Sequence, residues 1–219
     1  MRRDIVGAAL AIAIAGLAAL APVALLGGGS PRDDIYHAWA EDTVFTISEV
    51  RPGVFFATGR QGQVVGATSV FIVTDRDVIV VDDHITPTAA RALVSEIRRV
   101  TPKPIRYVVN THFHYDHTSD NGVFGPDVEI LSHPATRARL LATGLQSIRD
   151  QLTTLPNQIA VLRARRDTTR NDSVRTILDR QIRGLEQMQA EYRDLTVVLP
   201  SLTVDSSLVL YRTGRLAGD

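Results

Sequence analysis

The sequence predicts an α/β fold in which a sheet of short strands precedes a long helical hairpin. Short segments between residues 43 and 81 alternate apolar and polar side chains and are separated by turn residues, a pattern typical of strands. A helical period at 88–100 lies between apolar runs at 78–81 and 105–109, and that order predicts two parallel strands joined by a helix. Functional side chains are therefore expected at the carboxyl ends of these strands.

Length and composition are those of one domain with a sizeable core. The chain has 219 residues, of which 44% are hydrophobic. Its formal net charge is zero, so the charge balance gives no indication of a nucleic-acid partner. The sequence contains no cysteine. Disulfides, thiolate metal sites and cysteine nucleophiles are therefore excluded, and His, Asp and Glu are the metal ligands to consider.

The amino-terminal segment has the pattern of a targeting sequence. Arg2 and Arg3 precede an uncharged apolar run at 5–26, and we predict that 1–30 is either a secretory signal peptide or a membrane anchor. The run is long enough to span a bilayer, whereas Pro22 and small residues such as Ala24 suit a cleaved signal. Residues 31–42 are polar and are interpreted as a linker. Both alternatives predict a periplasmic, secreted or membrane-anchored protein.

The rest of the chain, 43–219, is expected to form one α/β domain. Thr88 is predicted to cap a helix that ends near Val100, because Pro102 and Pro104 prevent its continuation. Strands are predicted at 43–50, 54–57, 68–73, 78–81, 105–109, 128–131, 196–199, 202–204 and 207–211. The first four should form an antiparallel meander.

Residues 135–195 are predicted to form an antiparallel helical hairpin inserted in this domain, with a kink at Pro156 and a polar connection at 167–173. Each helix carries a narrow apolar stripe. The first stripe is Leu141, Leu145, Ile148, Leu152, Leu155, Ile159 and Leu162, and the second is Val174, Leu178, Ile182, Leu185, Met188 and Tyr192. The stripes either close on a partner, which would make the hairpin a lid or a self-association arm, or pack on each other.

The most specific feature is the segment 111–118, with the sequence THFHYDHT. His112 and His114 are two residues apart, so in an extended segment both imidazoles point the same way and can reach one ion, at about 2.0 to 2.1 Å for zinc. Asp116 and His117 follow as the chain turns and can face a second ion. The aromatic residues that alternate with them are expected to seat the loop in the core. This arrangement predicts a metal site.

The motif His112-x-His114-x-Asp116-His117 resembles the signature of the metallo-β-lactamase superfamily, and 80–82 and 121–124 resemble the segments that flank it. The resemblance implies an αββα sandwich with one or two zinc ions, His112 and His114 on the first and Asp116 and His117 on the second. It also implies a hydrolase in which a metal-bound hydroxide, oriented by Asp116 as the catalytic residue, attacks an ester, thioester, amide or lactam bond of a small-molecule substrate. Asp82 would support the ligands or serve as a structural group, and His84 is interpreted as a residue that packs beside the site or supports a ligand, not as a ligand itself.

Only the amino-terminal half of the family's pattern is recognisable. The family needs a further histidine, a bridging aspartate and a final histidine, yet no histidine follows His133. The sandwich is therefore expected to be incomplete. Three explanations are open: a truncated hydrolase, a hydrolase completed by another polypeptide, or a non-catalytic metal-binding or interaction module whose hairpin contacts a partner. We favour the first, because 212–219 does not resemble a domain-closing element.

Overall fold

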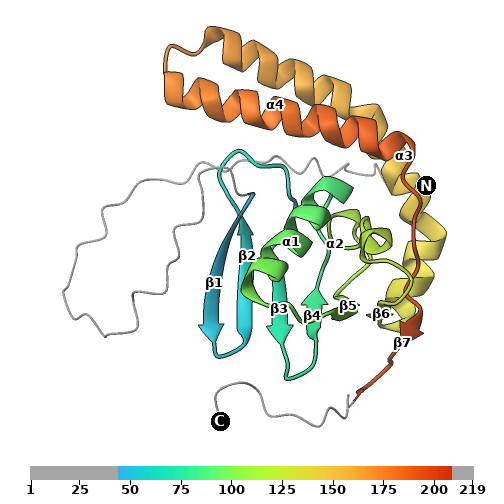
Figure 1. Ribbon diagram of the computed structural model, residues 1–219. Helices are drawn as coiled ribbons and strands as arrows, with labels where there is room; N and C mark the ends of the chain where they lie inside the picture. The colour runs from blue at the N-terminus through green and yellow to red at the C-terminus, as the bar shows by residue number, and fades with distance from the viewer. Residues whose placement is uncertain (1–43, 209–219) are drawn as a thin grey trace, which may run out of the picture. The chain divides into compact units, whose positions relative to one another are not determined.

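Seven strands form one mixed sheet in the order β1-β2-β3-β4-β5-β6-β7 (Figure 1). The antiparallel part contains β1 (Phe45–Arg51), β2 (Val54–Gly59), β3 (Ser69–Val73) and β4 (Val78–Val81). The parallel part continues from β4 with β5 (Ile105–Asn110), β6 (Glu129–Ser132) and β7 (Leu202–Thr203). The predicted α/β class is confirmed, including the meander and the strand-helix-strand order.

The structure is a computed structural model and describes residues 44–208. The chain divides into two units, Met1–His37 and Ala38–Asp219, and the described residues all belong to the second. The predicted targeting segment and linker, 1–42, and the end of the last predicted strand lie outside the described residues. In the part of the chain that is described, no helix is long and apolar enough to cross a membrane.

Helix α1 (Pro87–Val100) covers one face of the sheet (Figure 1). Its buried side chains, including Leu93 and Ile97, join a core with strand residues of that face. The helix cap is Thr86 and not the predicted Thr88: the Thr86 side chain accepts a hydrogen bond from the backbone N–H of Ala89 at 3.1 Å. Pro87 explains the difference, because proline is favoured at the first helical position, directly after the cap.

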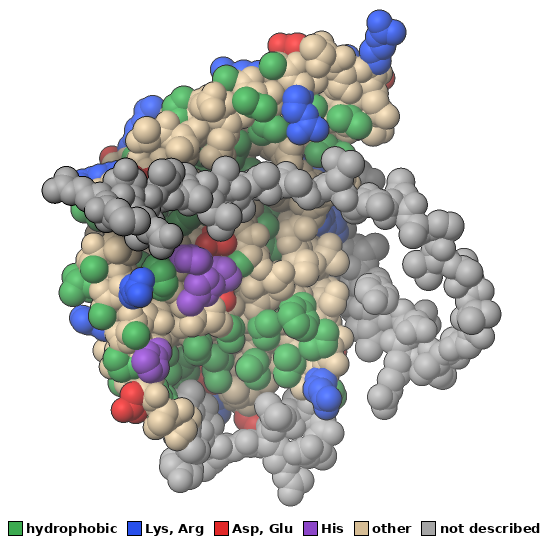
Figure 2. Space-filling view, turned by 180° about the vertical axis from the view of Figure 1, so that it is seen from behind, with side chains coloured by type: hydrophobic (Ala, Val, Ile, Leu, Met, Phe, Trp, Pro, Cys, Tyr) green, Lys and Arg blue, Asp and Glu red, His purple; other side chains and the backbone are tan. Residues whose placement is uncertain are grey.

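The opposite face of the sheet is apolar but only partly covered. Strand residues whose side chains alternate with those of the core form this face: Val54, Phe56, Val70, Ile72, Ile79, Val81, Tyr107 and Val109. All of them are half-buried except Phe56, which is exposed. Figure 2 shows apolar side chains gathered on this side of the molecule. One helical layer on one sheet is half of the αββα sandwich implied by the resemblance.

The predicted hairpin is formed by α3 (Pro134–Thr168) and α4 (Asp172–Arg193). Helix α3 is one continuous helix that includes Pro156, so the proline does not divide it. Seven buried residues form a second core between the helices: Ile148, Leu155, Ile159, Ile182, Leu185, Met188 and Tyr192. Val64, Ile85 and Tyr115 pack against this core from the sheet domain. The stripes therefore pack on each other and on the loops beside the histidine motif.

Three positions of the predicted stripes are wrong, because Leu141, Leu145 and Val174 are exposed. Leu140 and Gly144, one residue earlier on α3, are buried instead.

The predicted strand at 196–199 is also wrong. No ladder forms there; the Val198 carbonyl accepts a hydrogen bond from the Asn121 side chain at 2.9 Å, and Val197 packs on the second core.

The second core gives a stability prediction with a control on the same helix. Leu155 is fully buried, so Leu155→Ala should lower the free energy of unfolding by about 2 to 5 kcal/mol through lost apolar contact and a cavity. Leu141→Ala, at a position 65% exposed, should change it by less than about 0.5 kcal/mol. Urea unfolding followed by circular dichroism measures both. Equal losses would contradict the assignment of the buried face.

Candidate metal centre

Two neighbouring parallel strands position the site. Val81 of β4 is in register with Val109 of β5, so the residues that follow these strands meet at one edge of the sheet. Asp82 comes directly after β4, and Thr111 begins the histidine segment after β5. The short helix α2 (Tyr115–Thr118) then turns the chain back. The turn brings the rings of His112 and His117 to a centroid distance of 4.1 Å. Figure 2 shows histidine side chains grouped at the surface with acidic side chains beside them.

His112 and His114 form the first donor pair. Their facing nitrogens, Nε2 of His112 and Nδ1 of His114, lie 3.1 Å apart. The Thr111 hydroxyl donates to the Asp82 carboxylate at 2.8 Å and also lies 3.0 Å from Nδ1 of His112. A hydroxyl has one proton to donate, so Nδ1 of His112 acts as the donor toward Thr111. The lone pair of His112 Nε2 is thereby left facing His114.

Asp116 and His117 form the second donor pair. Nδ1 of His117 lies 2.8 Å from Oδ2 of Asp82, and in the neutral imidazole this nitrogen donates its proton to the carboxylate. Nε2 of His117 then has a free lone pair, and it faces Oδ2 of Asp116 at 3.5 Å. Two acceptor atoms that face each other need a proton or a cation between them. A histidine that binds a metal through one ring nitrogen commonly donates the N–H of the other ring nitrogen to a carboxylate, as His117 does to Asp82.

Both separations suit a shared zinc ion. Two ligand atoms at about 2.0 to 2.1 Å from a tetrahedral ion lie about 3.3 to 3.4 Å from each other. The observed distances of 3.1 and 3.5 Å lie on either side of this value. Within residues 44–208, however, no group of three or more His, Asp or Glu side chains converges as a metal site. The donors thus fit zinc in spacing and chemistry, with two candidate ligands at each of two positions.

The surroundings act in opposite directions on the two histidines. Burial lowers the pKa of His112, and the neighbouring His117 and His114 lower it further. Burial also acts to lower the pKa of His117, but the hydrogen bond and negative charge of Asp82, with the charge of Asp116, outweigh it and raise this pKa. The lowered pKa of His112 favours the neutral imidazole that metal binding requires. For His117, Asp82 both orients the ring and makes it a stronger base.

The loop between β2 and β3 supports Asp116 from the side. Gly66 has a φ of +79°, and a Cβ atom placed there would lie 2.9 Å from Cβ of Ile85 and 3.1 Å from Cβ of Asp116. Glycine is thus required both for the backbone conformation and for the close approach. Sequence reasoning assigned no role to Gly66 or Thr111. The glycine-bearing loop that contains Gly66 and the Thr111 hydroxyl next to His112 can be seen in the sequence. The contacts that give them a role form only in the tertiary fold.

The remaining predicted residues lie outside the two pairs. His84 is fully buried, packs against the Phe45 ring at a tilt and hydrogen-bonds to Ser69, and burial lowers its pKa to about 4. His133 caps α3 by accepting from the Ala135 N–H. Tyr115 packs on the second core, as expected for a residue that seats the loop. Phe113 instead lies against His114, with the Arg139 guanidinium 5.4 Å from its ring centre.

A family model matches the part of the chain that contains the histidine segment. Residues 62–147, which include all four proposed ligands, match the family model of the metallo-beta-lactamase superfamily. A search of curated proteins gave no match.

Similar solved structures include a metallo-beta-lactamase from Erythrobacter litoralis, which is 21% identical with a TM-score of 0.41 over 46% of each chain. The FIM-1 metallo-beta-lactamase from Pseudomonas aeruginosa, in its mono-zinc form, is 17% identical with a TM-score of 0.41 over 46% of each chain. A sec-alkylsulfatase from Pseudomonas sp. is 19% identical with a TM-score of 0.41, over 50% of this chain and 18% of that one. The chain thus spans less than half the length of these proteins.

The class defined by the fold and the site is an α/β protein with a His-x-His-x-Asp-His segment at the carboxyl edge of a mixed sheet. More specifically, the segment 62–147 matches the metallo-β-lactamase superfamily, as the motif and its flanking segments predicted.

The position of Gly66 gives a prediction about the site. Gly66→Ala should push Asp116 away from His117 and weaken zinc binding by about tenfold, comparable to the loss of a group that supports a ligand. Gly125→Ala is the matched control, since Gly125 also has a positive φ, of 87°, but its added Cβ would meet nothing within 4 Å. Both variants should lose stability from backbone strain, by about 1 to 3 kcal/mol. Competition with a zinc-sensitive dye measures the affinity, and equal zinc affinities of the two variants would refute the contact-based role.

Proposed function

We propose that the chain is the metal-binding half of a zinc-dependent hydrolase that cleaves an ester, thioester, amide or lactam bond in a small molecule. The observation that supports this proposal is the arrangement around Asp82. With Thr111, it leaves the Nε2 lone pairs of the two histidines facing a second possible metal ligand. The Nε2 atom of His112 lies 3.1 Å from Nδ1 of His114, and that of His117 lies 3.5 Å from Oδ2 of Asp116. A purely structural histidine cluster does not require free lone pairs in facing positions.

The four donors divide into two roles. His112 and His114 would hold one zinc ion, and Asp116 and His117 a second. Zinc, when bound, supplies Lewis acidity toward water and toward the oxygen of the bond that is cleaved. Asp116 would orient the attacking water molecule, as the resemblance implies. Asp82 keeps His117 in one tautomer, and Thr111 does the same for His112.

A second candidate function is a metal-binding or interaction module without catalysis. It is favoured by one observation: the described donors form two pairs, and no group of three converges within 44–208. Catalytic zinc sites normally have three protein ligands. Leu141, Leu145 and Val161, exposed on α3, could then serve as a contact surface or a self-association arm. Catalytic and non-catalytic alternatives share the same first step, which is zinc binding at the motif.

The location outside the cytoplasm is part of the proposal. It is supported by the paired arginines and the uncharged apolar run at 5–26. Whether the segment is cleaved or retained as an anchor is a separate question, which mass spectrometry of the protein isolated from cell fractions answers.

Metal binding gives the first test of the proposal. His112→Ala and His114→Ala should each lower bound zinc, measured by elemental analysis after gel filtration, because each removes half of one donor pair. His133→Ala is the control, as His133 is exposed and only caps α3. Unchanged zinc content in both motif variants would sink the assignment.

Hydrolysis gives the second test. The zinc-loaded protein should cleave at least one of a chromogenic cephalosporin, a thioester and an aryl ester, with activity lost in Asp116→Asn. Tight zinc binding without any turnover would leave the non-catalytic module as the better reading.

A further inference from the structure

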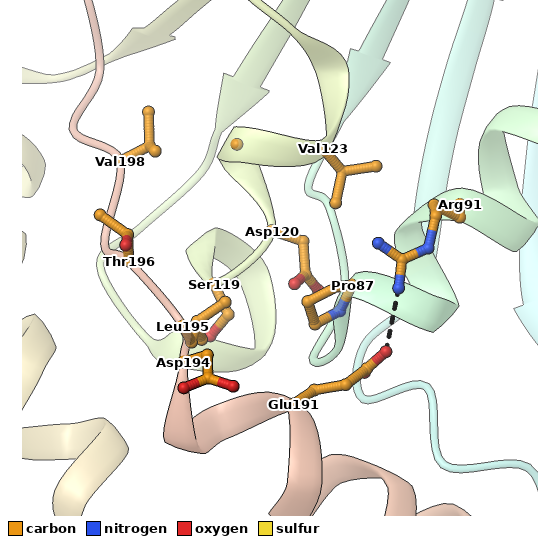
Figure 3. A pocket seen from close by; sticks show the side chains of 11 residues that line it. Pro87, Arg91, Ser119, Asp120, Val123, Glu191, Asp194, Leu195, Thr196 and Val198 are labelled. Carbon is orange, nitrogen blue, oxygen red and sulfur yellow. Dashed lines mark hydrogen bonds and ion pairs between the residues drawn. The ribbon is translucent and has the colours of Figure 1, made fainter.

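A pocket lies on the side of α2 that faces α1 and the end of α4. It has a volume of about 480 Å³. Its walls come from four parts of the chain: the start of α1, the turn after α2, the end of α4 and the segment that follows α4 (Figure 3). None of the four proposed metal ligands lines it.

Asp120 is the unusual residue of this pocket. It is 1% exposed, and neither of its carboxylate oxygens has a hydrogen-bond partner. Figure 3 shows its carboxyl group directed into the space between Pro87, Ser119 and Glu191. The backbone is fixed on both sides, since the Asp120 N–H donates to Asp83 at 3.3 Å and its carbonyl accepts from Val123 at 2.9 Å. A buried carboxyl group without partners costs free energy unless something pairs with it.

Arg91, the basic residue of the pocket wall, does not fill this role. Its guanidinium pairs with Glu191 at 3.0 Å. The Glu191 carboxylate is further occupied by the Thr88 hydroxyl and the Gln187 amide. The pocket thus contains three acidic residues, Asp120, Glu191 and Asp194, against one arginine that is already paired. Burial, and then the charge of Glu191, raise the pKa of Asp120 well above its usual value, while Arg91 lowers it.

The wall also has an apolar part, formed by Pro87, Val123, Leu195 and Val198, and Ser119 and Thr196 add polar side chains. A ligand that fits both parts carries a positive charge at one end and a short apolar group at the other. A guanidinium or primary ammonium group has the hydrogen-bond donors that both oxygens of Asp120 lack.

We propose that this pocket binds a small organic cation, such as an alkylguanidinium or alkylammonium compound, through a charge-assisted hydrogen bond to Asp120. The site is separate from the donor pairs at His112 to His117 and needs no metal. Asp83 is buried beside Asp120 with one carboxylate oxygen unpaired, and its burial and the charge of Asp120 raise its pKa well above its usual value.

A pair of ligands with the same shape and different charge tests the proposal. Methylguanidinium and neutral N-methylurea are titrated separately into the full chain, with a chelator present so that the result does not depend on zinc. Binding is followed by the methyl NMR signals of valine, among which Val123 and Val198 report on the pocket wall. Methylguanidinium should shift these two signals saturably, with a dissociation constant of about millimolar for so small a ligand. N-methylurea should bind at least about tenfold more weakly, because it lacks the charge.

Two variants complete the test. Asp120→Asn should weaken methylguanidinium binding at least about tenfold, whereas Asp205→Asn, an exposed carboxylate outside the pocket, should not change it. Equal binding of the two ligands, unchanged binding in Asp120→Asn, or shifts that miss Val123 and Val198 would each overturn the proposal. If Asp120→Asn does not fold, the comparison of the two ligands on the unmodified chain decides. Because zinc is absent throughout, failure here is distinct from failure of the proposed hydrolase function.

Discussion

The site depends on the hydrogen bonds of Asp82 more than on any other interaction. Its carboxylate accepts from the Thr111 N–H, the Thr111 hydroxyl and His117 Nδ1, so one side chain joins the end of β4 to both parts of the histidine segment. The residue has a φ of 62°, which costs about 1 to 2 kcal/mol for a side chain other than glycine. The backbone N–H donates to Val109 and the carbonyl accepts from Ser69. These partners keep Asp82, which is 5% exposed and has a strained backbone, in place, and its carboxylate favours the tautomers on which the proposed metal binding relies.

The helical hairpin supports the same edge of the sheet from outside. Tyr192 of α4 donates to the Ile85 carbonyl at 2.6 Å, and Arg180 donates to Gln61 at 3.0 Å, so α4 holds both loops that flank Asp116. Gly184 leaves room for Val64 to pack directly on α4. The hairpin is therefore more than a surface addition. Its packing fixes the loop that contains Gly66, and Gly66 in turn contacts Asp116.

Much of this could be predicted from local sequence patterns. Strand alternation, the helix of 88–100 and the stripe of α4 follow from side-chain periodicity, and the histidine motif located the site. The errors have physical causes. Leu141 and Leu145 fit the helical period but face solvent, because Leu140 and Gly144 pack inward at that end of α3. The cap of α1 is Thr86 and not the predicted Thr88, because Pro87 occupies the first turn of the helix. Thr111, Gly66 and Asp120 could not be assigned, since their roles arise only when segments distant in sequence meet.

Asp82 and Thr111 are proposed to fix the tautomers of His117 and His112 before any metal binds. Long-range proton–nitrogen NMR of the metal-free protein, with ¹⁵N-labelled histidine, measures these tautomers, at a pH above the raised pKa of His117 so that both rings are neutral. We expect both rings to be protonated at Nδ1, with Nε2 free, and added zinc to shift Nε2 of both rings. In Asp82→Asn the preference of His117 should weaken. A neutral ring of His112 or His117 protonated at Nε2 in the metal-free protein, or zinc that leaves both signals unchanged, would show that Asp82 and Thr111 do not have this role.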